Sequence, residues 1–252
     1  MALFQDGPIS SLEDLRVYET SLLETANIEG VSLSNKLELA QQEVGNEILR
    51  FLIQQLEPTE SVTPTKLNQV VATDPLRRWH ALRTLSVFFR DVHHNQLNDR
   101  YRAKWDAYES EAKGAARLLW EVGVGLVRSP LKRPAPPSLE LLPSDEEYPQ
   151  SLFKTTWVTG PFEESAASEA VLFAPAFAER PQLAAIDPPA RATGWHVYAG
   201  PAESLLTRQT TTAVSLTAPW VMPSSNFVAG AAAPFGQQPD YYIRLQRLLF
   251  RG

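Results

Sequence analysis

Residues 76–120 read LRRWHALRTLSVFFRDVHHNQLNDRYRAKWDAYESEAKGAARLLW, and the spacing of their apolar residues decides the fold of the N-terminal half. Apolar side chains recur at steps of three and four, which is the period of an α-helix. Asp74-Pro75 precedes the stretch, and proline suits the first helical position because its missing N–H would have no partner there. Gly123 ends it. We predict either one bent helix or two helices broken near His94.

Helical patterns also precede this stretch. Ser10 and Glu13 have the spacing of a capping box, in which each side chain accepts an unpaired backbone N–H of the first turn. A second pattern places apolar residues from Leu33 to Leu52 on one face and ends at Pro58. The sequence therefore predicts a helical bundle over residues 1–128.

Six prolines between residues 129 and 149 separate this helical part from the rest of the chain. Proline lacks the N–H that helices and sheets use, so we predict an extended, semi-rigid linker there. Five later segments are rich in aromatic and β-branched residues, with turn-forming residues between them. The predicted strands are 152–160, 170–178, 194–200, 213–217 and 241–250. The predicted fold class is α+β, with a β-sandwich-like domain over residues 150–252.

Composition excludes several classes of protein. The 252 residues contain no cysteine, which rules out disulfides, thiolate metal sites and cysteine nucleophiles. The net charge of -6 gives no overall attraction to nucleic acid or anionic membranes. No run of about 18 apolar residues predicts a membrane span. The opening MALFQDGPISSLEDL lacks the basic and apolar regions of a signal peptide.

No motif for catalysis stands out. The chain has neither a phosphate-binding Gly-rich loop nor a G-x-S-x-G elbow. Carboxylate runs such as Glu163-Glu164 and Asp145-Glu146-Glu147 lie in predicted loops, where charged residues are usually solvated. A glycosidase needs two carboxylates held across a cleft, and a sequence does not establish that geometry. We expect no enzymatic activity and no cofactor.

The histidines give at most a weak metal signal. His94 and Asp91 share one helical face, but the adjacent His93 points about 100° away and no third ligand is marked. We therefore expect a polar patch there and no bound metal. His80 follows Trp79 and is expected to be half-buried at the edge of the core. His196 alternates within a predicted strand and is expected on its surface.

Basic residues gather in the long helical stretch although the chain is acidic overall. One interpretation is a face that lines a channel through which DNA passes. The other is a solvent-exposed helix with Asp–Arg pairs, which is the commoner arrangement for any single arginine. The candidate channel-lining residues are Arg77, Arg78, Arg83, Arg100, Arg102 and Lys104.

Aromatic residues of the same stretch are candidates for a core or a subunit interface. Phe88 and Phe89 are adjacent, so apolar residues occupy more than one face of the helix. We expect a compact monomer to leave some of them uncovered, and a closed ring of copies to bury them. The candidate interface residues are Trp79, Phe88, Phe89, Tyr101, Trp105, Tyr108 and Trp120.

The order of these features from Leu12 to about Pro130 resembles the helical head-to-tail connector, or adaptor, proteins of tailed bacteriophages. The match rests on SSLEDLRVYE (10–19), VGNEILRFL (44–52) and the long stretch quoted above. The resemblance implies a ring of copies, commonly twelve, in the neck of the virion. Its implied partners are further copies, the portal protein, the next neck or tail protein, and genomic DNA passing through without sequence specificity. It implies no catalytic residue, no cofactor and no membrane.

The C-terminal part resembles a fibronectin type III or immunoglobulin-like module. GWHVYAGPAESLLTRQ (194–209) is similar to a central strand and turn of that fold, and APWVMPSSNFVAGAAAP (218–234) to a later segment. A small connector ends after its helical part, whereas this chain continues for about 120 residues. Three alternatives therefore stay open: another phage tail or baseplate protein, a carbohydrate-binding module protein, and a wall-degrading hydrolase.

Overall fold

The chain forms two compact units in the computed structural model, which describes residues 1–55, 64–96, 99–160, 163–175, 178–223 and 226–245. The helical unit comprises Gly7–Arg128 and Pro239–Gly252, and the β unit comprises Met1–Asp6 and Ser129–Gln238. The predicted α+β class is confirmed. The predicted division differs at both termini, because residues 1–6 belong to the β unit and residues 239–252 to the helical unit.

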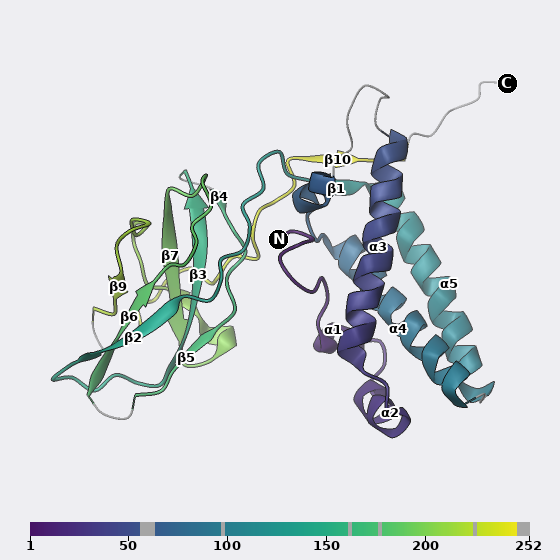
Figure 1. The fold of residues 1–252 in the computed structure, drawn as a ribbon, viewed down its shortest axis with the longest axis horizontal. Coiled ribbons are helices and arrows are strands. Elements are labelled where there is room, and N and C mark those ends of the chain that lie inside the picture. The colour runs from purple at the N-terminus through teal and green to yellow at the C-terminus, as the bar shows by residue number, and fades with distance from the viewer. Residues whose placement is uncertain (56–63, 97–98, 161–162, 176–177, 224–225, 246–252) are drawn as a thin grey trace. The chain divides into compact units, whose positions relative to one another are not determined.

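The helical unit contains three long helices and several short ones (Figure 1). Its elements are α1 (Leu12–Arg16), α2 (Leu22–Glu29), α3 (Leu33–Gln55), the 3₁₀ helix η1 (Pro64–Gln69), α4 (Asp74–Gln96) and α5 (Asp99–Val122). Helices α4 and α5 pack along each other, so the long stretch is two helices and a single continuous helix is excluded. Pro58, the predicted end of α3, lies outside the described residues.

The capping box at the start of α1 lies one residue later than predicted. Ser11 is the N-cap, and its hydroxyl accepts a hydrogen bond from the backbone N–H of Asp14. The Asp14 carboxylate accepts the N–H of Ser11 in return. Ser10, the predicted cap, is buried and bonds to another part of the unit. Two adjacent serines both fit the pattern, so spacing alone did not separate them.

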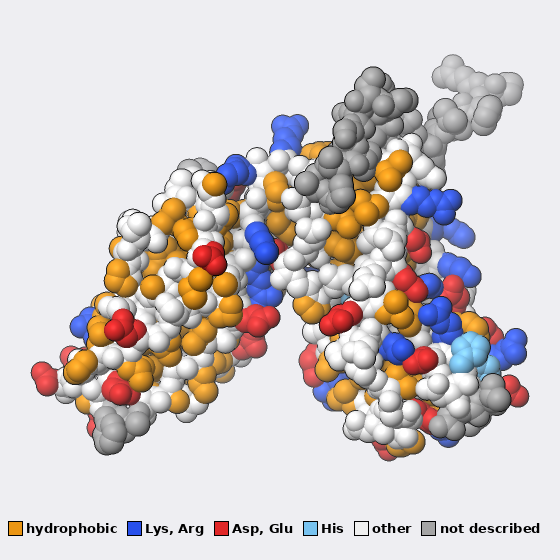
Figure 2. Space-filling model, in the orientation of Figure 1, with side chains coloured by type: hydrophobic (Ala, Val, Ile, Leu, Met, Phe, Trp, Pro, Cys, Tyr) orange, Lys and Arg blue, Asp and Glu red, His pale blue; other side chains and the backbone are white. Residues whose placement is uncertain are grey.

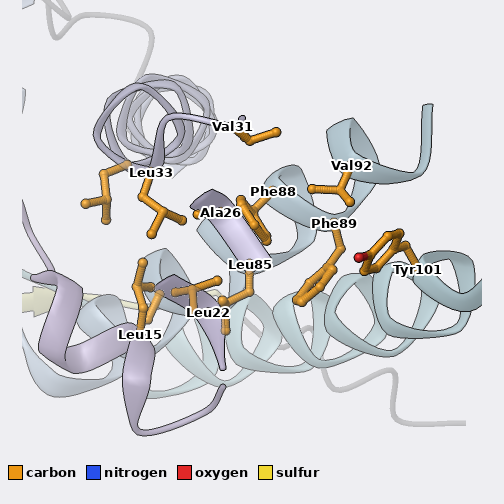
Figure 3. Packing of buried hydrophobic residues seen from close by; sticks show 12 residues of the cluster. Leu15, Leu22, Ala26, Val31, Leu33, Leu85, Phe88, Phe89, Val92 and Tyr101 are labelled. Carbon is orange, nitrogen blue, oxygen red and sulfur yellow. The ribbon is translucent and has the colours of Figure 1, made fainter. Parts of the chain in front are cut away.

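One apolar cluster joins α1 and α2 to the three long helices (Figure 3). It consists of Leu15, Leu22, Ala26, Val31, Leu33, Leu37, Ala81, Leu85, Phe88, Phe89, Val92 and Tyr101. These residues come from α1, α2, α3, α4 and α5 and from the turn after α2. Complete burial of such a side chain contributes about 1.5–3 kcal/mol relative to exposure. The short helices are thus fixed by packing against the long ones, since helices of this length are marginal alone.

A two-stranded antiparallel sheet completes the helical unit. Strand β1 (Val124–Leu126) pairs with β10 (Tyr241–Ile243). An ideal Cβ on Gly125 would lie 2.8 Å from the Pro239 ring, so the close approach of the two segments requires glycine there. Residues 241–250 were predicted as a strand of the β-sandwich, and that assignment is wrong for β10. Residues 246–250 lie outside the described residues.

The β unit consists of two antiparallel sheets with a shared core. One sheet has the order β2-β6-β9, and the other has β4-β3-β7-β8 with β5 also paired to β3. The strands are β2 (Ser138–Pro143), β3 (Ser151–Thr159), β4 (Glu163–Glu164), β5 (Val171–Phe173), β6 (Glu179–Ala184), β7 (Gly194–Gly200), β8 (Thr207–Arg208) and β9 (Trp220–Val221). The 3₁₀ helix η2 (Glu203–Leu205) lies between β7 and β8.

The core of the β unit draws on both sheets, as expected of a sandwich. Phe153 and Trp157 of β3, Trp195 of β7 and Leu183 of β6 are fully or almost fully buried in one cluster. They alternate along their strands with residues of the opposite face. In β7 all seven residues are buried, so the period of two in this strand separates the shared core from a second covered face.

Two sequence-based assignments in this unit need correction. The predicted linker 129–149 contains β2, a six-residue strand paired along its whole length with β6. Its proline at position 143 is tolerated because it ends the strand. The predicted strand 213–217 supplies only a single bridge, between Val214 and Trp195.

Candidate functional site

Arg83 lies at the junction of the three long helices. Its Nε donates to Glu43 of α3 at 2.6 Å, and a terminal nitrogen donates to Glu109 of α5 at 2.8 Å. Ser86 and Lys113 also contact Glu109. Burial raises the pKa of the Glu109 carboxyl, but these hydrogen bonds and cations lower it below its ordinary value overall. Arg83 therefore fastens α3, α4 and α5 together.

Arg100 and Lys104 fasten α5 to the N-terminal segment. Arg100 pairs with Glu29 at 3.2 Å, and the Tyr101 hydroxyl donates to the same carboxylate at 2.6 Å. Lys104 pairs with Glu19 at 2.8 Å. These cations meet carboxylates on other elements, whereas the sequence predicted pairs along one helix.

The other candidate channel residues are more open to solvent. Arg102 is paired with Asp106 on its own helix, at 4.0 Å. Arg78 is exposed and Arg77 half-exposed, and both line a groove of about 390 Å³ together with Asp14 and Tyr18. The six basic residues thus lie on two helices, and at least four are engaged with carboxylates. A role in lining a DNA channel stays a prediction.

Most of the predicted interface aromatics are core residues. Trp79, Phe88, Phe89 and Tyr101 are at most 6% exposed in a single copy of the chain. We expected a compact monomer to leave some of the seven aromatics uncovered, and these four are not among them, because the surrounding helices enclose them. Their surfaces are not available to another subunit without unfolding.

The remaining three aromatics lie at the margins of the core. Trp105 and Tyr108 are partly buried, and the Tyr108 ring stacks on Phe89 with 5.5 Å between centroids. Trp120 stacks on Phe51 at 4.5 Å and also lines two surface hollows. Each of these residues both packs inward and presents an outer edge.

Two groups of exposed apolar side chains lie outside the set of aromatic residues that the sequence predicted for a subunit interface. The first, here called the α1–α2 patch, consists of Leu12, Val17, Tyr18, Leu23 and Ile28. The second, here called the β10 patch, comprises exposed residues of β10 and of the segments that end near it, with Tyr241 and Tyr242 on opposite faces of the strand: Ile53, Leu118, Val122, Tyr241, Tyr242 and Leu245. Val17, the C-cap residue of α1, is 80% exposed, and Ile28 of α2 is 68% exposed.

Helix α2, which carries Leu23 and Ile28, lies at the opposite end of the helical unit from β10 (Figure 1). Val17 and Tyr18 lie nearer the middle of the unit and line a hollow with the first residues of α4. The ion pair between Glu29 and Arg100 fixes α2 at the N-terminal end of α5. Leu118 and Val122 lie at the C-terminal end of α5, about 30 Å further on at 1.5 Å per residue.

The sequence pattern placed Leu12 and Tyr18 on one apolar stripe with Leu15 and Leu22, but both are exposed. Val17, Leu23 and Ile28 lie off that stripe, and they were the available signal for an exposed apolar surface.

Two of the histidines, His80 and His196, lie in the protein interior. His80 is fully buried, although it was expected to be half-buried. His196 was expected on a strand surface but is also buried, with its Nδ1 2.7 Å from the Thr210 hydroxyl. Burial lowers the pKa of His196. Across the described residues, no group of three His, Asp or Glu side chains is placed to hold a metal ion.

A polar cluster lies on the outer face of the larger sheet. Glu164 accepts hydrogen bonds from the Tyr198 hydroxyl at 2.6 Å and from the Thr156 hydroxyl. Burial, together with the Glu164 carboxylate, raises the pKa of the Tyr198 hydroxyl. Glu163 is exposed at the edge strand β4.

One hollow in the β unit has a volume of about 440 Å³ and is lined mainly by small apolar side chains. Its two cations are already neutralised, since Lys154 pairs with Glu203 and Arg133 lies 3.8 Å from Glu169.

No protein-family model, curated protein or solved structure matches the chain. Among the described helices, none is long and apolar enough to cross a membrane. The functional argument therefore rests on the residues and their arrangement.

Proposed function

We propose that this chain is a structural subunit of a tailed-bacteriophage particle, without enzymatic activity. In this proposal it is a head-to-tail connector that forms a ring below the portal protein, around the DNA passage. The next neck or tail protein would dock onto the ring. The β unit would serve as an additional contact module.

The observation that carries the proposal is the pair of separate apolar patches on one helical unit. A ring is built by heterologous contacts, in which one surface of a subunit meets a different surface of the next. That geometry needs two unlike patches away from each other, as the α1–α2 patch and the β10 patch are. A two-fold dimer would need only one self-complementary patch.

The interior of the helical unit fits a load-bearing role. The Arg83, Arg100 and Lys104 pairs link different helices, and close-packed cores resist deformation. A subunit with a fixed interior can hold its two patches at a constant angle. A constant angle between successive copies is what closes a ring at a defined size.

The test uses two double variants that each remove one patch. Val17→Asp with Ile28→Asp disables the α1–α2 patch, and Leu118→Asp with Val122→Asp disables the β10 patch. Mass photometry of the purified chain, alone and with portal rings of its own particle, should show closed rings for the wild type. Each variant alone should stay monomeric, whereas their equimolar mixture should form dimers through the one intact pair of patches.

The control is Leu172→Asp, which alters an equally exposed side chain in the β unit and should leave ring formation unchanged. Circular dichroism checks that every variant is folded. A wild-type chain that stays monomeric with and without portal rings contradicts the proposal. So does a mixture of the two variants that remains monomeric.

A further inference from the structure

Strand β2 is an unusually long open edge. It ends the sheet β2-β6-β9, and no strand among the described residues pairs with its other side. The other edge strands of the β unit are shorter: β4, β8 and β9 have two residues each and β5 has three, whereas β2 has six. Proteins usually keep edge strands short to prevent unwanted pairing. An edge strand that stays long and open therefore indicates a role in binding a partner strand.

The hydrogen-bonding pattern shows which backbone groups β2 offers. The N–H of Ser144 donates to the carbonyl of Ala178, which extends the β2–β6 ladder by one hydrogen-bonded pair. In an antiparallel pair such residues alternate, so the even-numbered residues of β2 face β6. Leu139 and Leu141 consequently direct both their N–H and C=O groups to the open edge.

Prolines limit the open edge at both ends. Pro136 and Pro137 precede the strand, and Pro143 occupies the outward-facing position at its end. Proline has no N–H to give a partner strand, which is why it is tolerated at an edge. The available groups are therefore confined to a short window centred on Glu140, and this fixes the register of any added strand.

The chemistry around the window is acidic and apolar. Leu141 is 46% exposed. Five carboxylates lie on or beside the strand: Glu140, Asp145, Glu146, Glu147 and Glu179. The nearby cation Arg180 already donates its Nε to the carbonyl of Met222. Figure 2 shows acidic and hydrophobic side chains intermixed over this part of the β unit.

Charge argues against a second copy of β2 as the partner. The antiparallel register that uses both outward residues places Leu139 opposite Leu141 of the other copy. It also places Glu140 directly opposite its own counterpart. Like charges directly opposite each other destabilise a strand pair, whereas Lys or Arg opposite Glu140 would stabilise it.

We propose that β2 is a docking edge for an extended segment of another protein, which adds as a fourth strand to the sheet. The segment alternates apolar with basic residues and places Lys or Arg opposite Glu140. Backbone hydrogen bonds to Leu139 and Leu141 supply affinity, and the carboxylates supply selectivity, as in other strand-addition complexes. This proposal concerns the β unit and is independent of ring formation.

The test sorts a yeast-displayed library of random twelve-residue peptides on the full-length protein, with counter-sorting against Leu141→Pro. That substitution removes an outward N–H without removing a bond to β6. The matched control is Leu141→Ala, which keeps the N–H. Enriched peptides should be rich in Lys or Arg alternating with apolar residues. Leu141→Pro should weaken their binding at least tenfold and Leu141→Ala less than threefold, and Glu140→Lys should also weaken it.

Three outcomes overturn the proposal: no peptide distinguishes the wild type from Leu141→Pro, the enriched peptides are acidic, or β2 mediates a wild-type dimer that Leu141→Pro abolishes. Circular dichroism checks the fold of each variant. If Leu141→Pro is unfolded, the same hydrogen bonds can be tested on the bound peptide, by N-methylating every second backbone nitrogen of an enriched peptide. Only one of the two alternating sets should then abolish binding, and equal effects of both sets overturn the proposal.

Discussion

At the scale of single residues, His80 is the group most sensitive to its surroundings. Its Nε2 lies 3.2 Å from the carbonyl of Leu37, which can only accept, so Nε2 carries the proton. Its Nδ1 then accepts from the Ser10 hydroxyl at 2.5 Å, and the ring is neutral. Burial lowers the pKa of His80 from 6.5 to about 4.

We expect the free energy of unfolding to fall as the pH falls from 6.5 to 4. Between these values the unfolded chain binds a proton at His80 and the folded chain does not, so acid favours unfolding. At about 1.4 kcal/mol per unit between the two pKa values, the full effect is about 3 kcal/mol. Above pH 6.5 both states are neutral at this site, and its contribution to the pH dependence vanishes.

Urea denaturation of the wild type and His80→Gln at pH 7, 5.5 and 4.5 measures this effect. Glutamine can still donate to Leu37 and accept from Ser10, but it does not titrate. The variant should therefore lose less stability than the wild type between pH 7 and 4.5. His94→Gln, at an exposed position, is the control and should follow the wild type. Equal pH dependence in His80→Gln and the wild type would contradict the assignment.

Tyr198 gives a second prediction at this scale. Its hydroxyl is the donor to Glu164, and the ring is 1% exposed. Tyr198→Phe removes that donor and leaves the carboxylate with one hydroxyl partner, which should cost about 1–2 kcal/mol of unfolding free energy. Tyr242→Phe, at an exposed ring, should change stability by less than about 0.5 kcal/mol. Thermal and urea unfolding of both variants make the comparison, and equal effects would refute the role of the hydrogen bond.

The buried state of these polar residues was not predictable from the sequence. The partners of His80 lie 70 and 43 residues away, and the partner of His196 lies 14 residues away. Periodicity shows which face of an element a side chain occupies. It does not show which distant group will come to satisfy a polar atom, and that contact is what permits burial.

At the scale of elements, two glycines near the end of α5 should respond oppositely to the same substitution. A Cβ at Gly114 meets nothing within 4 Å, and the residue lies inside a helix. Gly123 has φ of +110°, and its Cβ would lie 2.8 Å from Arg244 and 3.0 Å from Tyr242. Gly114→Ala should stabilise the chain by about 0.5–1 kcal/mol. Gly123→Ala should destabilise it by about 1–3 kcal/mol.

Differential scanning calorimetry of the two variants checks this pair of predictions, with the wild type as reference. The variants share one chemical change within nine residues, so each acts as the control for the other. A destabilised Gly114→Ala would mean that the exposed face of α5 is covered in the folded protein. If Gly123→Ala left the stability unchanged, β10 and the residue after it would not lie close to Gly123.

Local periodicity explains why the helices were predictable and the strand pairings were not. The period of 3.6 lies within one segment, so the start of α4 at Asp74 could be placed to within a few residues. The same periodicity continued through His93, so it did not decide between one bent helix and two helices. The alternating pattern of a strand does not show which other strand it pairs with. Pairing of β1 with β10 joins residues more than 110 positions apart, and the aromatic pattern of Tyr241 and Tyr242 fits either unit equally well.

At the scale of the whole molecule, each unit is assembled from two segments, so the chain passes between the units three times. Sequence analysis placed a single proline-rich connection between residues 129 and 149. It could not place the others, because composition changes little around residues 6 and 238. The C-terminal segment thus completes the helical unit, although the whole β unit precedes it in the chain.

Removing residues 239–252 should therefore loosen the helical unit and not the β unit. The segment supplies the Asp240 carboxylate that accepts the N–H of Arg128, the ring of Pro239 that covers Gly125, and the N–H that Leu245 donates to Trp120. Without them the open edge of β1 faces water. Backbone amides there should exchange with solvent at least tenfold faster, which corresponds to about 1.4 kcal/mol less protection.

Hydrogen–deuterium exchange with mass spectrometry on a chain ending at Gln238 measures this directly. Faster exchange should be confined to β1, the end of α5 and Arg128, while peptides from β3 and β7 keep wild-type rates. The control is Asp240→Asn in the full chain, which keeps β10 but weakens its contact with Arg128 and should raise exchange only near that residue. Equal protection of β1 in the truncated and full chains, or loss of protection in β7, would show that the C-terminal segment belongs elsewhere. Because β1 is also held by the N–H of Val71, which donates to the carbonyl of Gly125, the unit should open at this end without unfolding completely.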